Sequence, residues 1–261
     1  MTTTRAAVLT LAIPLVLILT LAGSMQPTHA AGGPAKGVKN IVLVHGAWAD
    51  GSSWAKVIPL LQAKGYTVTA VQNPLTSLKD DVAATKRVLD LQNGPILLVG
   101  HSWAGMVITQ VGTDPKVAGL VYVNAFAPSV GDSAGSLGHG YPTPPGVTTL
   151  TQSEGFLWLP PPVVARYFTP ELSSFESAVV AATQVPIAAA SFTETVTVAA
   201  WKTKPSWCIV GDRDQMLDPG LERAMAKKIK ARVLELNVGH TPMLELPGKV
   251  ADFIAAAAAS L

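Results

Sequence analysis

The stretch "LVGHSWAGM", residues 98–106, places Ser102 between a histidine and a tryptophan, directly after an apolar run that ends in glycine. The run "PILLVG" (95–100) is typical of a buried strand, and apolar residues at helical spacing follow the serine. A serine at a strand-to-helix junction lies on a sharp turn, with its hydroxyl displayed at the end of the sheet. We therefore interpret Ser102 as a nucleophile, with a helix-capping serine as the simpler alternative.

The turn crowds strand against helix, so the residues two positions before and after the serine must be small. Gly100 and Ala104 meet this need. The strict pattern is Gly-x-Ser-x-Gly, and here alanine replaces the second glycine while Gly105 follows it. The pattern is weak in isolation and gains weight from its position between a strand and a helix.

Apolar runs and helical patterns alternate along most of the chain. We expect strands at 38–46, 66–72, 95–100, 117–126, 206–211 and 232–238. We expect helices at 53–65, 77–94, 103–112 and 221–231, and a last helix from about residue 247. Continuous apolar strands alternating with helices predict an α/β fold with a mostly parallel sheet flanked by helices.

One long segment breaks this alternation. Residues 129–205 begin with the Gly- and Pro-rich stretch "SVGDSAGSLGHGYPTPPG" and continue into weak helical patterns. The segment is too long for an ordinary connection. We interpret it as a cap inserted after the fourth core strand, within a single domain at 31–261.

A serine hydroxyl needs a base, and a histidine oriented by a carboxylate supplies one. His240 follows the sixth expected strand, at the sheet edge where Ser102 also emerges. The other four histidines are less suitable, because they precede the serine or lie in the cap: His29, His45, His101 and His139.

The carboxylate should follow the fifth expected strand, in "IVGDRDQMLDP". We favour Asp214, which is far enough along the loop to reach sideways to a histidine. Asp212 is the alternative, and it is otherwise a turn residue. Asp218 is expected to cap a helix before a proline, and Asp132 after the fourth strand is a further rival.

The oxyanion formed by attack on a carbonyl needs preorganised N–H donors. The backbone N–H groups of Trp103, after the nucleophile, and Ala47, after the first strand, are the expected donors. The sequence has no histidine pair at ligand spacing and no His-Glu-x-x-His motif, so we expect no metal.

Three motifs together resemble the α/β-hydrolase superfamily: "LVHGAW" (43–48), "LVGHSWAG" (98–105) and "VGHTPML" (238–244). The stretch at 45–71 looks like the small carboxylesterase and hydroxynitrile-lyase-like branch. The resemblance covers about residues 38–258 and is weakest across the cap. It implies a Ser-His-Asp esterase mechanism without a cofactor, acting on small to medium, partly apolar carboxylic esters.

Other functions on this fold remain open at this stage. Hydroxynitrile lyases of this branch carry a lysine after the histidine and a threonine near the oxyanion loop, whereas here Thr241 follows His240 and "VLVHGAW" has no threonine. Perhydrolysis by the same triad is a second alternative. A non-catalytic small-molecule-binding member is the third, and it usually has a broken triad.

Aromatic residues near these loops or in the cap could line a substrate pocket. We select Trp48, Phe126 and Trp158 for this role, with ordinary core packing as the alternative for each one. The net charge of +2, with 14% charged residues, does not favour a nucleic-acid partner. The only cysteine, Cys208, lies in an apolar run and is expected to be buried.

Residues 1–30 have the layout of a secretory signal peptide. Arg5 precedes an apolar run that extends to about residue 22, and Thr28 and Ala30 occupy the −3 and −1 positions of a cleavage site. The alternative is an uncleaved membrane anchor, which would be the only membrane contact of the chain. The run is short for a span, and Pro14 interrupts it. The sequence therefore predicts a secreted or periplasmic protein.

Cleavage of this segment is directly testable. Protein recovered from the native host's medium or cell envelope should begin near Ala31, because the small residues at 28 and 30 define the cleavage site. N-terminal sequencing checks this expectation. A chain that still begins at Met1 in the membrane fraction would support the anchor.

Overall fold

The computed structural model describes residue 2 and residues 37–261 of the chain. The predicted signal peptide lies outside the described residues, apart from residue 2. The chain divides into units Met1–Ala30 and Ala31–Leu261, and all that follows concerns the second unit. Within the described part of the chain, every helix is too short or too polar to traverse a bilayer.

A six-stranded parallel sheet forms the centre of this unit, with strand order β2-β1-β3-β4-β8-β9. Its strands are β1 (Asn40–Val44), β2 (Thr67–Ala70), β3 (Ile96–His101), β4 (Val117–Val123), β8 (Ser206–Gly211) and β9 (Arg232–Leu236). The residues of β1, β3 and β8 are buried throughout, as expected for strands covered on both faces. Cys208 is buried in β8, as its apolar surroundings predicted.

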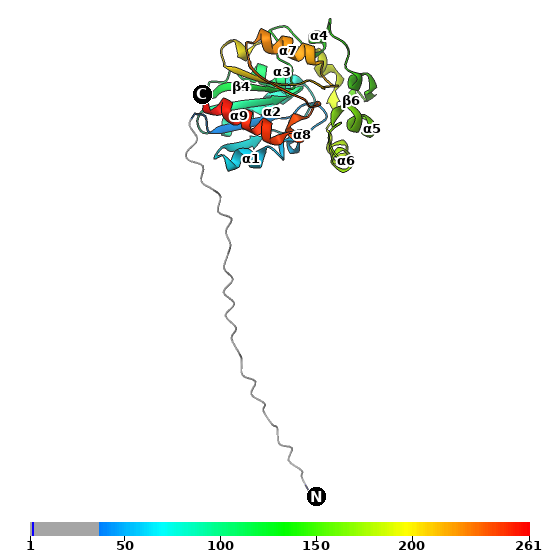
Figure 1. The fold of residues 1–261 in the computed structure, drawn as a ribbon, viewed down its shortest axis with the longest axis horizontal. Helices are drawn as coiled ribbons and strands as arrows, with labels where there is room; N and C mark the ends of the chain where they lie inside the picture. Colours follow the sequence, from blue (N-terminus) through cyan, green and yellow to red (C-terminus); the bar gives the residue numbers. More distant parts are fainter. Residues whose placement is uncertain (1, 3–36) are drawn as a thin grey trace. The chain divides into compact units, whose positions relative to one another are not determined.

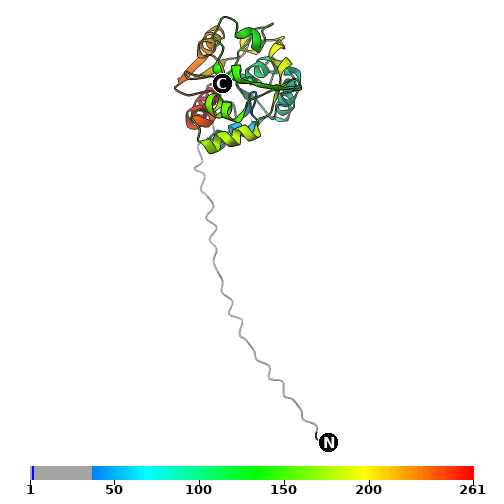
Figure 2. The same cartoon turned by 90° about the vertical axis from the view of Figure 1, so that its right-hand side faces the viewer.

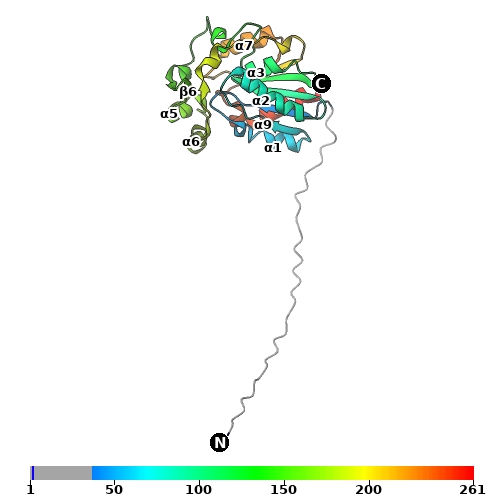
Figure 3. The same ribbon diagram turned by 180° about the vertical axis from the view of Figure 1, so that it is seen from behind.

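Helices cover both faces of the sheet (Figures 1 and 3). One face carries α1 (Ile58–Ala63) and α9 (Pro247–Ala259), whose apolar side chains share a core with alternate residues of the strands. The other face carries α2 (Leu78–Leu91), α3 (Ala104–Val111) and α7 (Pro219–Lys228). This arrangement confirms the predicted fold class.

The predicted helix at 53–65 is shorter than expected. A 3₁₀ turn, η1 (Gly51–Trp54), comes first, and α1 begins only at Ile58. Asp50 caps η1 by accepting a hydrogen bond from the N–H of Ser52, so the chain begins a tight turn before the helical stretch. The other predicted elements agree with the structure to within a few residues.

Residues between β4 and β8 form a cap beside the sheet, seen face-on in Figure 2. Its centre is a small antiparallel sheet with strand order β5-β6-β7. The strands are β5 (Thr151–Ser153), β6 (Phe156–Trp158) and β7 (Ile187–Ala188). The helical segments are α4 (Ala134–Leu137), η2 (Pro145–Thr149), α5 (Pro161–Val163), η3 (Val164–Phe168), α6 (Ser174–Thr183), η4 (Ala189–Thr193) and η5 (Ala200–Lys202).

Candidate active site

Ser102 lies on the turn between β3 and α3 with a φ of +54°. This left-handed conformation is unfavourable for a residue with a side chain and persists only where the surroundings enforce it. The N–H of Ser102 donates to the carbonyl of Val123, at the end of the neighbouring strand β4, at 3.2 Å. The serine therefore occupies a strained turn at the carboxyl edge of the sheet, as the sequence predicted.

The close approaches around this turn explain the sequence pattern. A Cβ on Gly100 would lie 2.9 Å from the carbonyl oxygen of Ala104, so that position needs glycine. A Cβ on Gly105 would lie 1.9 Å from the carbonyl oxygen of Phe126. Ala104 itself is buried without difficulty. The glycine that the structure requires after the serine is therefore Gly105, one residue later than in the pattern Gly-x-Ser-x-Gly.

The structure brings Ser102, His240 and Asp214 into one hydrogen-bonded chain. The Ser102 hydroxyl lies 2.9 Å from Nε2 of His240, and Nδ1 of His240 lies 2.7 Å from Oδ2 of Asp214. The loop after β9 supplies the histidine, and the loop after β8 supplies the carboxylate. With Nδ1–H donating to Asp214, the Nε2 lone pair faces the serine hydroxyl, which is the tautomer that a general base requires.

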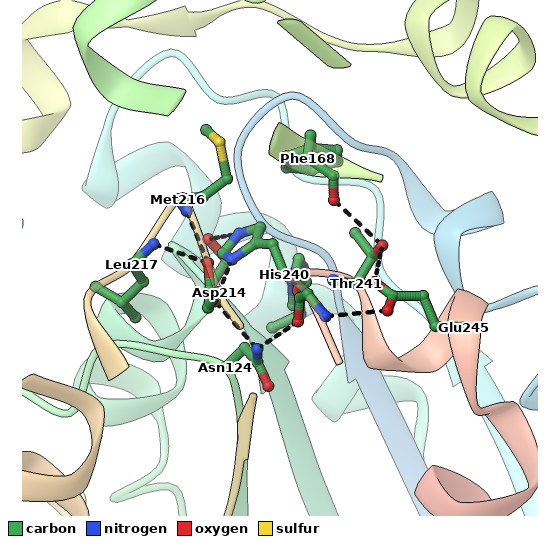
Figure 4. A network of polar contacts seen from close by, with 11 residues as sticks. Asn124, Phe168, Asp214, Met216, Leu217, His240, Thr241 and Glu245 are labelled. Atoms are coloured by element: carbon green, nitrogen blue, oxygen red, sulfur yellow. Dashed lines mark hydrogen bonds and ion pairs between the residues drawn. The ribbon is translucent and has the colours of Figure 1, made fainter. Parts of the chain in front are cut away.

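Asp214 is completely enclosed, and its hydrogen bonds keep it ionised (Figure 4). Its Oδ1 accepts from the N–H groups of Met216 and Leu217 at 2.7 and 2.9 Å, and Oδ2 accepts from the amide of Asn124 at 3.0 Å. Burial acts to raise the pKa of Asp214, but the charge of His240 and these donors together hold that pKa below its ordinary value.

The rival carboxylates occupy other positions. Asp212 is exposed to solvent. Asp218 caps α7, where its Oδ1 accepts from the N–H of Leu221 at 2.9 Å. Asp132 accepts from the N–H of Ser129 in its own turn, at 2.8 Å. The structure therefore places only Asp214 of these four against His240.

The loop after β1 comes close to the nucleophile. A Cβ on Gly46 would lie 2.7 Å from the Cβ of Ser102, so only glycine allows this approach. The next residue, Ala47, and Trp103 supply the two predicted N–H donors. Within residues 37–261 neither N–H finds a hydrogen-bond acceptor, so both are free to bind an oxyanion.

Two other histidines near the site are structural. Nε2 of His45 accepts from the N–H of Asn73 at 2.9 Å, and its Nδ1 lies 2.9 Å from the carbonyl oxygen of Gly46. Nε2 of His101 donates to the carbonyl of His240 at 2.8 Å. Burial, with a contribution from His240, lowers the pKa of His101 to about 3, so its ring is neutral and supports the histidine loop.

Three contributors to the site were not predicted from the sequence. Asn124 donates to Asp214 and also to the carbonyl of Gly239, at 3.0 Å in each case. Glu245 accepts from the N–H of Gly239 at 3.0 Å, and Phe168 of the cap packs its ring 5.3 Å from that of His240 (Figure 4). Only Asn124 had a sequence signal, because it is a polar residue near the end of the otherwise apolar run at 117–126.

A cavity of about 300 Å³ lies between the cap and the core beside this site. Trp48 and Phe126, two of the residues selected for a substrate pocket, line it together with Met216 and Leu217 from the loop that carries Asp214. The third residue selected for a substrate pocket, Trp158, does not line this cavity. Side chains alternate along a strand, so in β6 Leu157 faces the cavity whereas Trp158 is 41% exposed and borders a separate surface groove.

Metal ligation finds no support in the part of the chain that the structure describes. Residues 37–261 contain no group of three or more His, Cys, Asp or Glu side chains that could hold a metal ion.

Comparison with known proteins identifies the class. Residues 41–253 match the model of the alpha/beta hydrolase family, and the chain belongs to this family. The predicted membership is thereby confirmed.

Individual relatives include a carbendazim hydrolyzing esterase from Nocardioides sp. (strain SG-4G), 35% identical over 108 residues. That match covers 36% of this chain and 45% of the esterase, less than half of its length. A probable hydrolase R7 from Phoma sp. is 26% identical over 240 residues, covering 82% of this chain and 96% of that protein. The structure of a pyrethroid hydrolase from Sphingobium faniae JZ-2 superposes with a TM-score of 0.73 at 22% identity, over 85% of this chain and 97% of that one, which shows the shared fold.

The geometry predicts that Asp214, and not Asp212, orients His240. Replacing Asp214 by asparagine should slow the labelling of Ser102 by a fluorophosphonate by about 10³–10⁴-fold, because an amide favours the wrong histidine tautomer. Asp212→Asn, two residues away and exposed, is the matched control and should change the rate by less than about twofold. Equal effects of the two substitutions would contradict this assignment of the acid.

Proposed function

We propose that this protein is a serine hydrolase that cleaves carboxylic esters through an acyl-enzyme intermediate. One observation carries the proposal: the hydroxyl of Ser102, on its strained turn, lies 2.9 Å from Nε2 of a histidine that Asp214 holds by Nδ1 at 2.7 Å. This constellation deprotonates a serine while it attacks a carbonyl.

Acylation follows from these contacts. His240 accepts the proton of the Ser102 hydroxyl through Nε2 as Oγ bonds to the carbonyl carbon of the ester. The oxyanion is held by the N–H groups of Ala47 and Trp103. The imidazolium, stabilised by Asp214, then donates its proton to the departing alkoxide, which leaves as the alcohol.

Deacylation repeats these steps with water. His240 takes a proton from a water molecule, whose oxygen attacks the acyl carbon bound to Ser102. The same two N–H groups hold the second oxyanion. The proton then passes from His240 to Oγ, which frees the serine and releases the carboxylic acid.

The cavity between cap and core supports a substrate with an apolar group. Aromatic and aliphatic side chains dominate its lining, among them Trp48, Phe126, Phe192 and Leu157. Its titratable lining residues are Asp218, His139 and Tyr141, so the cavity offers no lysine or arginine to a substrate carboxylate. We therefore propose neutral esters of small to medium size, with an apolar portion in this cavity.

Residues of this chain favour hydrolysis over the alternatives. The carbendazim hydrolyzing esterase and the pyrethroid hydrolase are named for hydrolytic reactions, and an alpha-hydroxynitrile lyase from Arabidopsis thaliana is also similar, 30% identical over 104 residues. This chain differs from the lyase branch at Thr241, where a lysine is expected after the histidine. The hydroxyl of Thr241 is occupied by the carbonyl of Phe168 and the carboxylate of Glu245, at 3.3 and 3.2 Å. A non-catalytic role would leave the intact Ser-His-Asp chain without purpose.

Removal of the nucleophile tests the proposal. Ser102→Ala should reduce the hydrolysis of p-nitrophenyl esters, from acetate to octanoate, by about 10⁴-fold or more, because only the oxyanion donors and binding remain. Circular dichroism and thermal melting should show an intact fold. Ser260→Ala, on the exposed end of the chain, is the control and should retain wild-type turnover. Turnover by the Ser102 variant at the wild-type rate would refute the mechanism.

Filling the cavity tests where the apolar portion binds. Val147→Trp should lower kcat/KM for octanoate by about tenfold or more while acetate changes by less than about twofold, because the larger side chain occupies space that only a long chain needs. Val130→Trp, at a position that is 52% exposed and outside the cavity, is the control. An equal loss on both esters would place the long chain elsewhere.

A further inference from the structure

A buried carboxylate lies next to the oxyanion donor Trp103. Asp81 is in the first turn of α2 and has no exposed surface. Its Oδ2 accepts from the indole Nε1–H of Trp103 at 2.7 Å, and its Oδ1 accepts from the backbone N–H of Leu75 at 2.8 Å. The ion pairs among residues 37–261 do not include Asp81.

Burial of this carboxylate is costly. A buried charge without a cationic partner is unfavourable, and an aromatic or aliphatic side chain would fill the same space without this penalty. Burial raises the pKa of Asp81 to about 6, with the negative charges of Asp80 and Glu194 adding to the effect and its two N–H donors opposing it. A buried carboxylate that is retained despite this unfavourable free energy indicates a role beyond packing.

The contact fixes the orientation of Trp103. The residue combines a backbone N–H that binds the oxyanion with a side chain that is 1% exposed. Its ring lies 5.6 Å from that of Phe192 in the cap, and Asp81 holds the nitrogen edge of the same ring. Because the side chain is held at its nitrogen edge by Asp81 and packs on Phe192, it restricts the position of the Trp103 Cα and with it the backbone N–H.

The same carboxylate is linked to the cap. Leu75, whose N–H binds Asp81, has a φ of +58°, and its carbonyl accepts from the N–H of Ala188 in β7 at 2.9 Å. The first N–H of α2, on Leu78, donates to the cap carboxylate of Glu194 at 2.9 Å. Asp81 therefore joins the loop that binds the cap to the residue that binds the oxyanion.

The other oxyanion loop has a parallel attachment. Trp48 directly follows the donor Ala47 and has a φ of +56°. Its Nε1–H donates to the carbonyl of Leu157 in β6 at 3.0 Å, and its ring stacks on Phe192 with centroids 6.1 Å apart. Both donor loops are thus held by a tryptophan, and Phe192 contacts both tryptophans.

We propose that Asp81 is a positioning residue for the oxyanion hole, which holds the Trp103 N–H in place and ties it to the docked cap. This inference rests on the proposed ester hydrolysis at Ser102. Asp81 touches no reacting atom, and it acts through the indole of Trp103. Its loss should therefore lower kcat, where the oxyanion forms, more than it raises KM.

Asparagine is an informative replacement because it keeps the shape of the side chain. A carboxylate accepts on both oxygens, whereas an amide has one acceptor and one N–H₂ donor. Asp81→Asn therefore satisfies either Trp103 or Leu75 and directs an N–H₂ group at the other N–H. Trp103→Phe is the complementary change, because it keeps an aromatic ring and removes the indole donor.

The first measurement is steady-state hydrolysis of p-nitrophenyl butyrate by folded, active-site-titrated protein. Asp81→Asn should lower kcat by about tenfold to a hundredfold, less than the 10²–10³-fold lost when an oxyanion donor is removed outright, with KM changed by less than about threefold. Asp80→Asn is the matched control, because this carboxylate lies one residue away, is exposed and bonds only to Ser77 and Thr76. The control should retain wild-type kcat.

Two readouts separate positioning from a packing role. The inhibition constant of phenylboronic acid, whose adduct with the serine presents an oxyanion, should rise by the same factor as kcat/KM falls. In the wild type, kcat should fall as the pH falls through about 6, because protonation of Asp81 removes the acceptor of one of its two N–H partners, Trp103 or Leu75. Asp81→Asn should lack that component of the pH profile.

The outcomes are distinct. The inference is overturned if Asp81→Asn has the same kcat and the same pH profile as the control Asp80→Asn. It is also overturned if Asp81→Asn loses stability but keeps the wild-type kcat. If Asp81→Asn does not fold, Trp103→Phe decides, because a wild-type kcat in that variant also overturns it. Non-additive losses in the double variant support it. Failure of the proposed function looks different, since the wild type itself would then not hydrolyse the ester.

Discussion

The left-handed backbone at Ser102 is the constraint on which the rest of the site depends. A non-glycine residue in this conformation costs about 1–3 kcal/mol, which the surrounding contacts must offset. The turn is tied to β4 through the Val123 carbonyl, and the backbone of Gly46 comes so close to Ser102 that Gly46 cannot carry a Cβ. The strained residue therefore dictates glycine in the loop after β1, whereas Gly105 in the first turn of α3 is needed for its close approach to the backbone of Phe126.

The parallel sheet explains why distant residues meet at this turn. Strands that run in the same direction end at the same edge, so the loops after β1, β3, β8 and β9 all emerge there. The sequence was sufficient to predict this convergence, because each strand is a local apolar run and the chain order serine, acid, histidine is fixed by the topology. For the same reason Ser102, Asp214 and His240 could be chosen from the sequence.

Contacts between the cap and the core could not be predicted in the same way. The bond from Trp48 to the Leu157 carbonyl joins residues 109 positions apart, and no local pattern encodes it. The inner face of β6 could not be predicted either, because a three-residue strand gives no alternation from which to tell that Leu157 rather than Trp158 lines the cavity. Asp81 lies within the helix expected at 77–94, and only the packed structure shows that its side chain is buried.

Three buried carboxyl groups near the site differ in pKa because they accept different numbers of hydrogen bonds. Burial acts to raise the pKa of each one, so the difference between them lies in their partners. Asp214 has four N–H donors, and its pKa is lowered; Asp81 has two, and its pKa is about 6. Glu222 on α7 has no donor among residues 37–261, and burial, together with the charge of Asp214, raises its pKa well above the ordinary value.

These differences in pKa among the buried carboxyl groups fit the chemistry that we propose for the site. Burial and the charge of Asp214 raise the pKa of Glu222 well above its ordinary value, which favours the neutral acid beside Asp214. Asp214 alone keeps its charge across the range in which the histidine must accept and return a proton. The fold thus selects the triad acid by surrounding one carboxylate with donors and withholding them from its buried neighbour.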